Sequence, residues 1–218
     1  MAVNKRYAIF DLDGTLLDSM GWWKGLSEEF LRSRGVTELP DGLLDQIKTM
    51  TVLESADLFI RTCGISGTEA SVAEEINALM DRHYREDISL KLGVKSYLER
   101  LKAKGVRMCV ASATSAELIA ACLRRLESVD YFEGFFSCED IGAGKTRPDI
   151  YLKAAAKMGA RPEDTAVYED ALYAAETAKK AGFYVVGVYD KDRCQTEEER
   201  KYLEAMADEI IENWEEEE

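Results

Sequence analysis

Five short apolar runs, each bounded by turn residues, alternate along this chain with stretches of helical periodicity. The apolar runs are rich in β-branched and aromatic residues, as strands are; they cover residues 7–10, 106–111, 135–138, 165–168 and 183–188. The helical stretches lie between them, at residues 95–105, 115–127, 148–159 and 171–182. Strands and helices in such alternation pack as a parallel sheet with helices on both faces. The sequence therefore predicts an α/β protein with a doubly wound, mostly parallel sheet.

A long helical segment interrupts this alternation. Residues 15–90 contain stretches such as WWKGLSEEFLRSRG and TEASVAEEINALMDRHYRE and no convincing strand. The second strand of the sheet is thereby delayed by roughly ninety residues, which is far longer than an ordinary loop. We therefore expect an inserted α-helical domain at residues 15–90 and a discontinuous core domain formed by residues 1–14 and 91–218.

The composition limits the partners that this chain can have. Its formal net charge of −14 disfavours a nucleic-acid partner, because binding to a phosphate backbone needs a basic patch. No stretch approaches the ~20 apolar residues of a membrane span, and the N-terminal segment lacks the apolar core of a signal peptide. We therefore expect a cytoplasmic protein without a membrane partner. The five cysteines contain no CxxC pair, so they indicate neither a disulfide framework nor a zinc site.

Two carboxylates, Asp11 and Asp13, directly follow the first predicted strand, YAIF. Ligands of open α/β sheets bind outside the carboxyl ends of the strands. Side chains two residues apart in an extended chain point the same way, and two like charges held together need a cation or a proton beside them. The pair therefore indicates a metal site. A calcium loop of the EF-hand type is excluded, because the acidic residue that closes such a loop is missing.

Further polar residues lie at the ends of later predicted strands. The second strand runs into Ser112, and Thr114 with Glu117 is expected to form a capping box that opens the next helix. Ser112 and the neighbouring main-chain N–H groups would then form an anion site at a helix N-terminus. The strand at residues 165–168 runs into a second acidic pair, Glu169 and Asp170.

Lys145 adds a positive charge to this set. It lies on a glycine-flanked loop just before Pro148, which is expected to start a helix. Each feature by itself has a structural alternative: the acidic residues as turn or helix-start carboxylates, Ser112 as a helix-start serine, and Lys145 as a solvated loop cation. Their occurrence at successive strand ends, in this order, favours one site that combines a metal, a phosphate and a nucleophile.

Four motifs carry a resemblance to a known superfamily. They are DLDGT (residues 11–15), CVASAT (109–114), GKTRPDIY (144–151) and YEDALYAAETAKKAG (168–182). In this order they resemble the motifs of the haloacid dehalogenase superfamily, whose core is Rossmann-like. With the helical insert directly after the first motif, the chain is similar to the branch with a C1-type cap that includes phosphoglycolate phosphatase and β-phosphoglucomutase. It departs from the usual pattern at Thr146, Ala171 and Ala174, where proline, serine and glycine are frequent.

The resemblance implies a phosphatase that acts on a small phosphorylated metabolite through an aspartyl-phosphate intermediate. Asp11 would attack phosphorus, and Asp13 would protonate the leaving oxygen and then activate water. Lys145, Ser112 and the N–H of Ala113 would bind the phosphoryl oxygens, which suits a carboxylate nucleophile that needs its target neutralised.

The resemblance also implies Mg²⁺ as the cofactor. A carboxylate oxygen of Asp11, the main-chain carbonyl of Asp13 and the side chain of Asp170 would hold the ion, with Glu169 as a further ligand or as a support for the others. Magnesium suits such an all-oxygen site. The inserted domain at residues 15–90 would be the cap that selects the leaving group.

Two other functions stay open at this level. The first is a phosphomutase that returns the phosphoryl group to a sugar phosphate; the β-phosphoglucomutase pattern has a histidine early in the cap, whereas the only histidine here, His83, lies at the far end of the insert. The second is a non-catalytic binding protein, which the loss of Asp11, Asp13 or Lys145 would favour, and all three are present.

The insert contains four residues with two interpretations each. Trp22 and Trp23 are expected in the core of the cap, with a role in lining the substrate pocket as the alternative. Lys48 and Arg82 are expected on the surface, with contact to a distal anion of the substrate as the alternative. No feature of the sequence indicates an oligomeric state.

Overall fold

The structure is a computed structural model, and it describes residues 4–47, 50–190 and 196–216. The chain forms two compact units. The first, which we call the sheet unit, comprises Met1–Met20 and Ile88–Glu218; the second, the helical unit, comprises Gly21–Asp87. No helix in the described part of the chain has both the length and the apolar character needed to cross a bilayer.

The sheet unit is built on a parallel sheet with the strand order β3-β2-β1-β4-β5-β6. Every pairing between neighbouring strands is parallel. The strands are β1 (Tyr7–Phe10), β2 (Arg107–Ser112), β3 (Phe135–Ser137), β4 (Thr165–Glu169), β5 (Tyr184–Val188) and β6 (Glu209–Ile211). The expected α/β class with a doubly wound parallel sheet is confirmed. The short edge strand β6 was not expected, because its three residues carry too little pattern to distinguish a strand from a loop.

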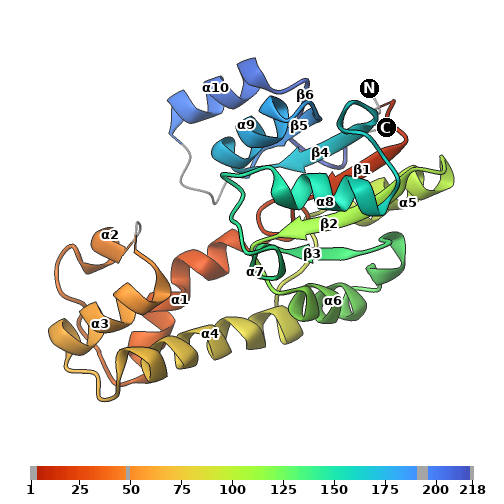
Figure 1. Cartoon of the computed structure of the whole chain (residues 1–218). Coiled ribbons are helices and arrows are strands. Elements are labelled where there is room, and N and C mark those ends of the chain that lie inside the picture. Colours follow the sequence, from red (N-terminus) through yellow and green to blue (C-terminus); the bar gives the residue numbers. More distant parts are fainter. Residues whose placement is uncertain (1–3, 48–49, 191–195, 217–218) are drawn as a thin grey trace. The chain divides into compact units, whose positions relative to one another are not determined.

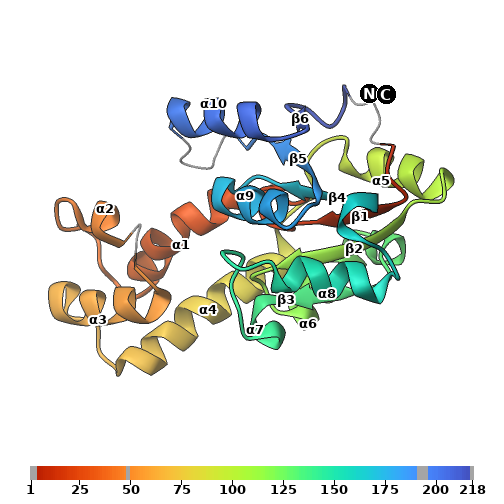
Figure 2. The same cartoon turned by 45° about the horizontal axis from the view of Figure 1, so that its top comes forward.

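Helices cover both faces of this sheet (Figure 1, Figure 2). The helices of the sheet unit are α5 (Val94–Ala103), α6 (Ala116–Arg125), α7 (Cys138–Ile141), α8 (Asp149–Lys157), α9 (Leu172–Lys180) and α10 (Glu197–Met206), with single 3₁₀ turns at Val129–Tyr131 and Pro162–Asp164. Right-handed crossovers place α5 and α6 on one face and α8 and α9 on the other, because the strand order reverses direction after β3. The sequence did not predict the short, polar α7 and the charged α10.

The two faces of the sheet carry different cores. On the α8 side, Ile9 of β1 and Val167 of β4 belong to a buried cluster with Ile150 and Ala154 of α8. On the opposite side, the Phe10 and Tyr168 rings stack with centroids 4.2 Å apart. Successive side chains of a strand point to opposite faces of the sheet. The same period sets the face to which the residues at the end of each strand point.

The helical unit contains α1 (Met20–Ser33, whose first residue belongs to the sheet unit), α2 (Leu43–Ile47), α3 (Val52–Cys63) and α4 (Glu69–Glu86). Capping boxes at Thr51 and Thr68 begin α3 and α4, since each threonine side chain accepts a hydrogen bond from the main chain three residues on. The rings of Phe30 on α1 and Phe59 on α3 pack at 6.2 Å in the core of this unit.

The helical unit, Gly21–Asp87, is a few residues shorter at each end than the insert expected at residues 15–90. Leu16 and Leu17 are fully buried. The carbonyl of Leu16 accepts a hydrogen bond from the N–H of Lys91 at 2.9 Å, and the N–H of Asp18 donates to Ser89 at 3.0 Å. Residues 15–20, which were expected in the insert, therefore belong with the sheet unit. That the helical unit acts as a cap stays a prediction.

Candidate active site

The candidate site lies at the carboxyl edge of the sheet, where β1, β2 and β4 end side by side. Asp11 continues β1, and its N–H donates to the carbonyl of Tyr168 in β4 at 2.9 Å. Asp11 and Glu169 follow Ile9 and Val167 by two residues, so their side chains point to the α8 side of the sheet. The strand period therefore brings two carboxylates from neighbouring strands to the same place.

Lys145 lies between these two carboxylates. Its ammonium contacts Asp11 Oδ1 and lies 2.6 Å from Glu169 Oε1. Lys145 is only 7% exposed and Glu169 is fully buried. Burial alone would lower the pKa of Lys145, but the Asp11 and Glu169 carboxylates outweigh it and raise this pKa. The lysine is therefore a fixed positive charge at the nucleophile predicted from the sequence, and the alternative of a solvated loop cation is wrong.

Glu169 has a further partner that the sequence did not indicate. The hydroxyl of Tyr151, on α8, donates to Glu169 Oε1 at 2.7 Å. Burial, and then the nearby Glu169 charge, raises the pKa of Tyr151 well above its usual value, so the phenol stays a donor. The available signals were its place at the end of the motif GKTRPDIY and in the first turn of the helix that follows Lys145. Pro148 is the N-cap residue of that helix and not its first residue.

Asp11, Glu169 and Asp170 form a group that could hold a metal ion, since one oxygen of each lies within 4.8 Å of the others. All three are buried. The pKa of Glu169 is raised because burial, and then the Asp11 and Asp170 charges, outweigh the effect of Lys145. A cation bound at this group would stabilise the charged forms of the three buried carboxyl groups, for which one ammonium is too little counter-charge.

One atom of this group supports the fit of Mg²⁺. Glu169 Oε2 is buried and has no hydrogen-bond partner within the described residues. Buried carboxylate oxygens are rarely left without a donor or a cation. An all-oxygen donor set with a free oxygen is the chemistry that Mg²⁺ takes. The residues present therefore fit the cofactor that the sequence predicts.

Asp13 has different neighbours from Asp11. Its Oδ1 accepts a hydrogen bond from the hydroxyl of Ser19 at 2.8 Å, and its Oδ2 accepts one from Thr114 at 2.8 Å. Ser112 Oγ lies 3.5 Å from the same Oδ2. Three neutral hydroxyls thus lie around the carboxylate of Asp13, and two of them donate to it at 2.8 Å. Its predicted role as a metal ligand uses the main-chain carbonyl, and this role stays a prediction.

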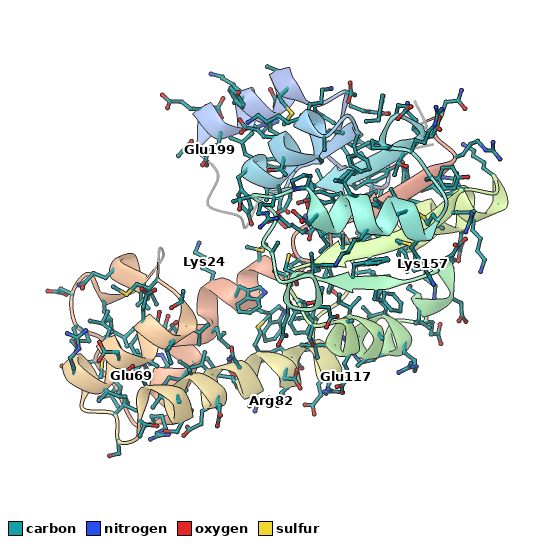
Figure 3. The ribbon with its side chains drawn as sticks, viewed as in Figure 1. Lys24, Glu69, Arg82, Glu117, Lys157 and Glu199 are labelled. Carbon is teal, nitrogen blue, oxygen red and sulfur yellow. The ribbon has the colours of Figure 1, made fainter. Side chains whose placement is uncertain are left out.

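The expected capping box at Thr114 and Glu117 is wrong. Ser115 caps α6, since its side chain accepts a hydrogen bond from Leu118 N. Thr114 turns its hydroxyl to Asp13 instead, and Glu117 lies exposed at the start of α6 (Figure 3). A threonine can cap a helix or bind a carboxylate, and the tertiary contact to Asp13 decides between the two.

Ser112 and Ala113 lie at the carboxyl end of β2, and their binding of phosphate stays a prediction. Ser112 is the last residue of β2 and is buried, and its Oγ accepts a hydrogen bond from the N–H of Thr114 at 3.1 Å. Ala113 follows it and is exposed. The chain turns here between β2 and the N-terminus of α6, so its main-chain N–H groups lie at the same edge as Asp11.

The helical unit holds the remaining candidates. The Trp22 ring packs over His83 with centroids 4.3 Å apart, and Trp23 Nε1 donates to the hydroxyl of Tyr84 at 3.2 Å. Both tryptophans thus contact α4, although Trp22 is 37% exposed. Arg82, on α4 (Figure 3), forms an exposed ion pair with Glu29 at 3.0 Å. Lys48 and Cys194 lie outside the described residues.

A family model and several known proteins match this chain. A family model of haloacid dehalogenase-like hydrolases matches residues 5–182. The chain is 26% identical over 174 residues to the phosphorylated carbohydrates phosphatase of Thermotoga maritima, covering 80% of each protein. It is 32% identical over 194 residues to the β-phosphoglucomutase of Bacillus subtilis, covering 83% of this chain and 81% of the relative.

A solved structure shows the same fold. It is a Thermotoga maritima protein described provisionally as a β-phosphoglucomutase, and it superposes with a TM-score of 0.82 at 25% identity, covering 97% of this chain and 95% of that one. Together with the family model, which spans most of the chain, this likeness establishes the class. The chain belongs to the haloacid dehalogenase-like hydrolase family, and the family expected from the four motifs is confirmed.

Proposed function

We propose that the protein is a Mg²⁺-dependent phosphatase that hydrolyses a small phosphorylated metabolite through an aspartyl-phosphate intermediate. The observation that carries the proposal is the pairing of Asp11 with the buried Lys145, next to the acidic group of Asp11, Glu169 and Asp170. A nucleophile, a fixed positive charge and a cation-binding group thus occupy one strand edge, where ligands of such sheets bind.

In the first step, a carboxylate oxygen of Asp11 forms a bond to phosphorus while the bond from phosphorus to the leaving oxygen breaks. A carboxylate is a competent nucleophile only when the charge of the phosphoryl group is neutralised. Lys145 contributes to this neutralisation, and the Ser112 hydroxyl and the Ala113 N–H are the proposed donors to the remaining oxygens. Bound Mg²⁺, held by Asp11, Asp170, Glu169 and the carbonyl of Asp13, would supply Lewis-acid neutralisation.

Asp13 is the proposed general acid and general base of the reaction. It gives a proton to the leaving oxygen in the first step, which makes the leaving group an alcohol. In the second step it takes a proton from water, whose oxygen attacks phosphorus; the bond from phosphorus to Asp11 breaks, and inorganic phosphate leaves. The hydroxyls of Ser19 and Thr114 support this role, because they orient the carboxylate and can follow either protonation state by rotating.

A phosphorylated carbohydrate is the substrate class that the comparisons favour. The Thermotoga maritima relative is a phosphorylated carbohydrates phosphatase, and the chain covers most of it. The test is phosphate release from a panel of sugar, polyol and aromatic phosphate monoesters with Mg²⁺ and with EDTA. We expect Mg²⁺-dependent hydrolysis with a preference among carbohydrate phosphates. Absence of hydrolysis across the panel in the presence of Mg²⁺ would refute the proposal.

A phosphomutase is the second candidate, because the relative from Bacillus subtilis with 32% identity is a β-phosphoglucomutase. A mutase must keep water from attacking its aspartyl phosphate until the sugar phosphate is bound. His83, the only histidine of the chain, is a poor candidate for such a gate. It is buried, and its two ring nitrogens lie 2.8 Å from Glu29 and 2.7 Å from Asp87.

The two candidates differ in the product of one reaction. With β-glucose 1-phosphate and a trace of the 1,6-bisphosphate, a phosphatase releases inorganic phosphate and a mutase forms glucose 6-phosphate. We expect phosphate to dominate. Fast isomerisation with little phosphate release would make the protein a mutase.

A further inference from the structure

The carboxylate of Glu169 is held in an asymmetric way. Its Oε1 accepts from the ammonium of Lys145 at 2.6 Å and from the hydroxyl of Tyr151 at 2.7 Å. Its Oε2 is buried and has no partner within the described residues. Both donors thus act on one oxygen, and the other is left for a ligand.

We propose that Tyr151 is a positioning residue for the divalent cation: its hydroxyl holds Oε1 of Glu169 and thereby presents Oε2 to the metal. This inference rests on the proposed function in one respect, namely that Asp11, Glu169 and Asp170 bind Mg²⁺. It goes further in assigning a role to a residue of α8 that touches neither the metal nor the substrate.

Lys145 cannot fix this carboxylate by itself. Its ammonium is shared between Glu169 and Asp11, and it would follow either charge when a phosphoryl group arrives. The terminal torsion of a glutamate is broad and roughly two-fold, so one donor leaves the plane of the carboxylate poorly defined. A second donor from another direction fixes that plane. Outer groups that orient a ligating carboxylate in this way commonly matter for metal affinity.

Tyr151 is suited to this task because its ring is packed within the core. The side chain is fully buried, and its ring packs edge-on against Phe183 with centroids 6.2 Å apart. Its neighbours on α8, Ile150 and Ala154, belong to the same core cluster beneath β1 and β4. A tyrosine in such a core places its hydroxyl with little freedom.

The charge of the donor also matters. The phenol is neutral, so it holds the carboxylate without neutralising it. A second ammonium in its place would lower the negative charge that attracts the cation to Asp11, Glu169 and Asp170. Glu169 thus accepts from one charged donor, Lys145, which also contacts Asp11, and from one neutral donor, Tyr151.

The test measures Mg²⁺ binding directly, by calorimetric titration of the metal-free full-length protein. Tyr151→Phe removes one oxygen and keeps the packed ring. We expect its Kd for Mg²⁺ to rise by about tenfold, the lower end of what loss of such a supporting group costs. The Mg²⁺ concentration for half-maximal hydrolysis should rise with it, while kcat at saturating Mg²⁺ changes less. The matched control is Tyr131→Phe, which removes a tyrosine–glutamate hydrogen bond (to Glu99, 3.1 Å) outside the site.

A double-mutant cycle tests whether the hydroxyl acts through Glu169. In a Glu169→Gln background, Tyr151→Phe should add little further loss of Mg²⁺ affinity. This comparison stays decisive even if Tyr151→Phe lowers the melting temperature, because both backgrounds share the altered core. An equal effect in the two backgrounds, or a Kd for Tyr151→Phe within twofold of the wild-type value, overturns the inference.

The outcomes separate the inference from the proposed function. If the wild-type protein binds Mg²⁺ more tightly than Tyr151→Phe but hydrolyses no monoester, the proposed function fails and the role of Tyr151 stands. If hydrolysis depends on Mg²⁺ and the two Kd values agree, only the role of Tyr151 fails.

Discussion

The α-carbon of Gly14 faces the carboxylate of Asp170 so closely that a β-carbon there would lie 2.5 Å from Asp170 Oδ2. Gly14 also has a φ of +82°, a left-handed conformation that residues with a side chain rarely adopt. The turn after β1 therefore needs glycine for two reasons, its backbone conformation and the approach of a candidate metal ligand.

Gly14→Ala should consequently impair Mg²⁺ binding as well as folding. The added methyl group pushes Asp170 out of place, and we expect the Mg²⁺ concentration for half-maximal activity to rise by about tenfold. Gly105→Ala is the matched control, because Gly105 has a φ of +76° and open space around its α-carbon. Both variants should lose about 1–2 kcal/mol of stability from the backbone alone. Equal Mg²⁺ titrations for the two would show that the contact with Asp170 is unimportant.

Asp11→Asn should abolish turnover and leave the fold intact. The amide of asparagine cannot replace the attacking carboxylate, so turnover is lost. The fold should remain because the asparagine side chain has the same shape as aspartate, and the change removes one buried negative charge next to Glu169. Phosphate release measures the activity, and circular dichroism with thermal melting checks the fold. Near-normal hydrolysis by a folded Asp11→Asn protein would eliminate the aspartyl-phosphate mechanism.

Lys145→Ala should lower kcat by about a hundredfold or more, the scale of losing one preorganised charge at a transition state. It should also lower the free energy of unfolding by about 3–5 kcal/mol, because Asp11 and Glu169 lose their buried counter-charge. Steady-state kinetics and urea unfolding, measured on the same preparation, report the two effects. If only the unfolding free energy falls, the lysine has a structural role alone.

Asp170→Ala should lower the affinity for Mg²⁺, because it removes one oxygen ligand. The measurement is the Mg²⁺ concentration that gives half the maximal rate, and we expect it to rise by about tenfold or more. Asp140→Ala serves as the control, since Asp140 is exposed on α7 and outside the acidic group. An unchanged Mg²⁺ titration for Asp170→Ala would remove Asp170 from the ligands.

The pH dependence of stability should reflect two buried thiols. Burial raises the pKa of Cys109 to about 12 and that of Cys122 to about 11. In the unfolded chain a thiol loses its proton near pH ~8.5. Between that pH and about 11 the unfolded chain therefore holds fewer protons than the folded one, and stability falls as pH rises. Urea unfolding from pH 8 to 10.5 should show a shallower fall in the Cys109→Ala/Cys122→Ala variant than in the wild type, and parallel slopes would contradict this.

Much of the sheet unit follows from local patterns. The apolar runs predict β1 to β5, and the residues at the carboxyl ends of β1, β2 and β4 are those that converge at the site. The physical reason is that strand ends of a parallel sheet meet at one edge whatever the loops between them do. Asp11, Ser112 and Glu169 could therefore be grouped from the chain alone.

The sequence by itself determined the class of fold, the helical insert and the chemical types at the strand ends, because periodicity and turn residues encode which positions are buried. Only the tertiary structure decided which atoms meet. Tyr151 binds Glu169, and Thr114 binds Asp13 instead of capping its helix. These pairs join elements far apart in the sequence, and their geometry depends on how α8 and α6 pack on the sheet. A pattern of residue types carries no information on that packing at the level of single hydrogen bonds.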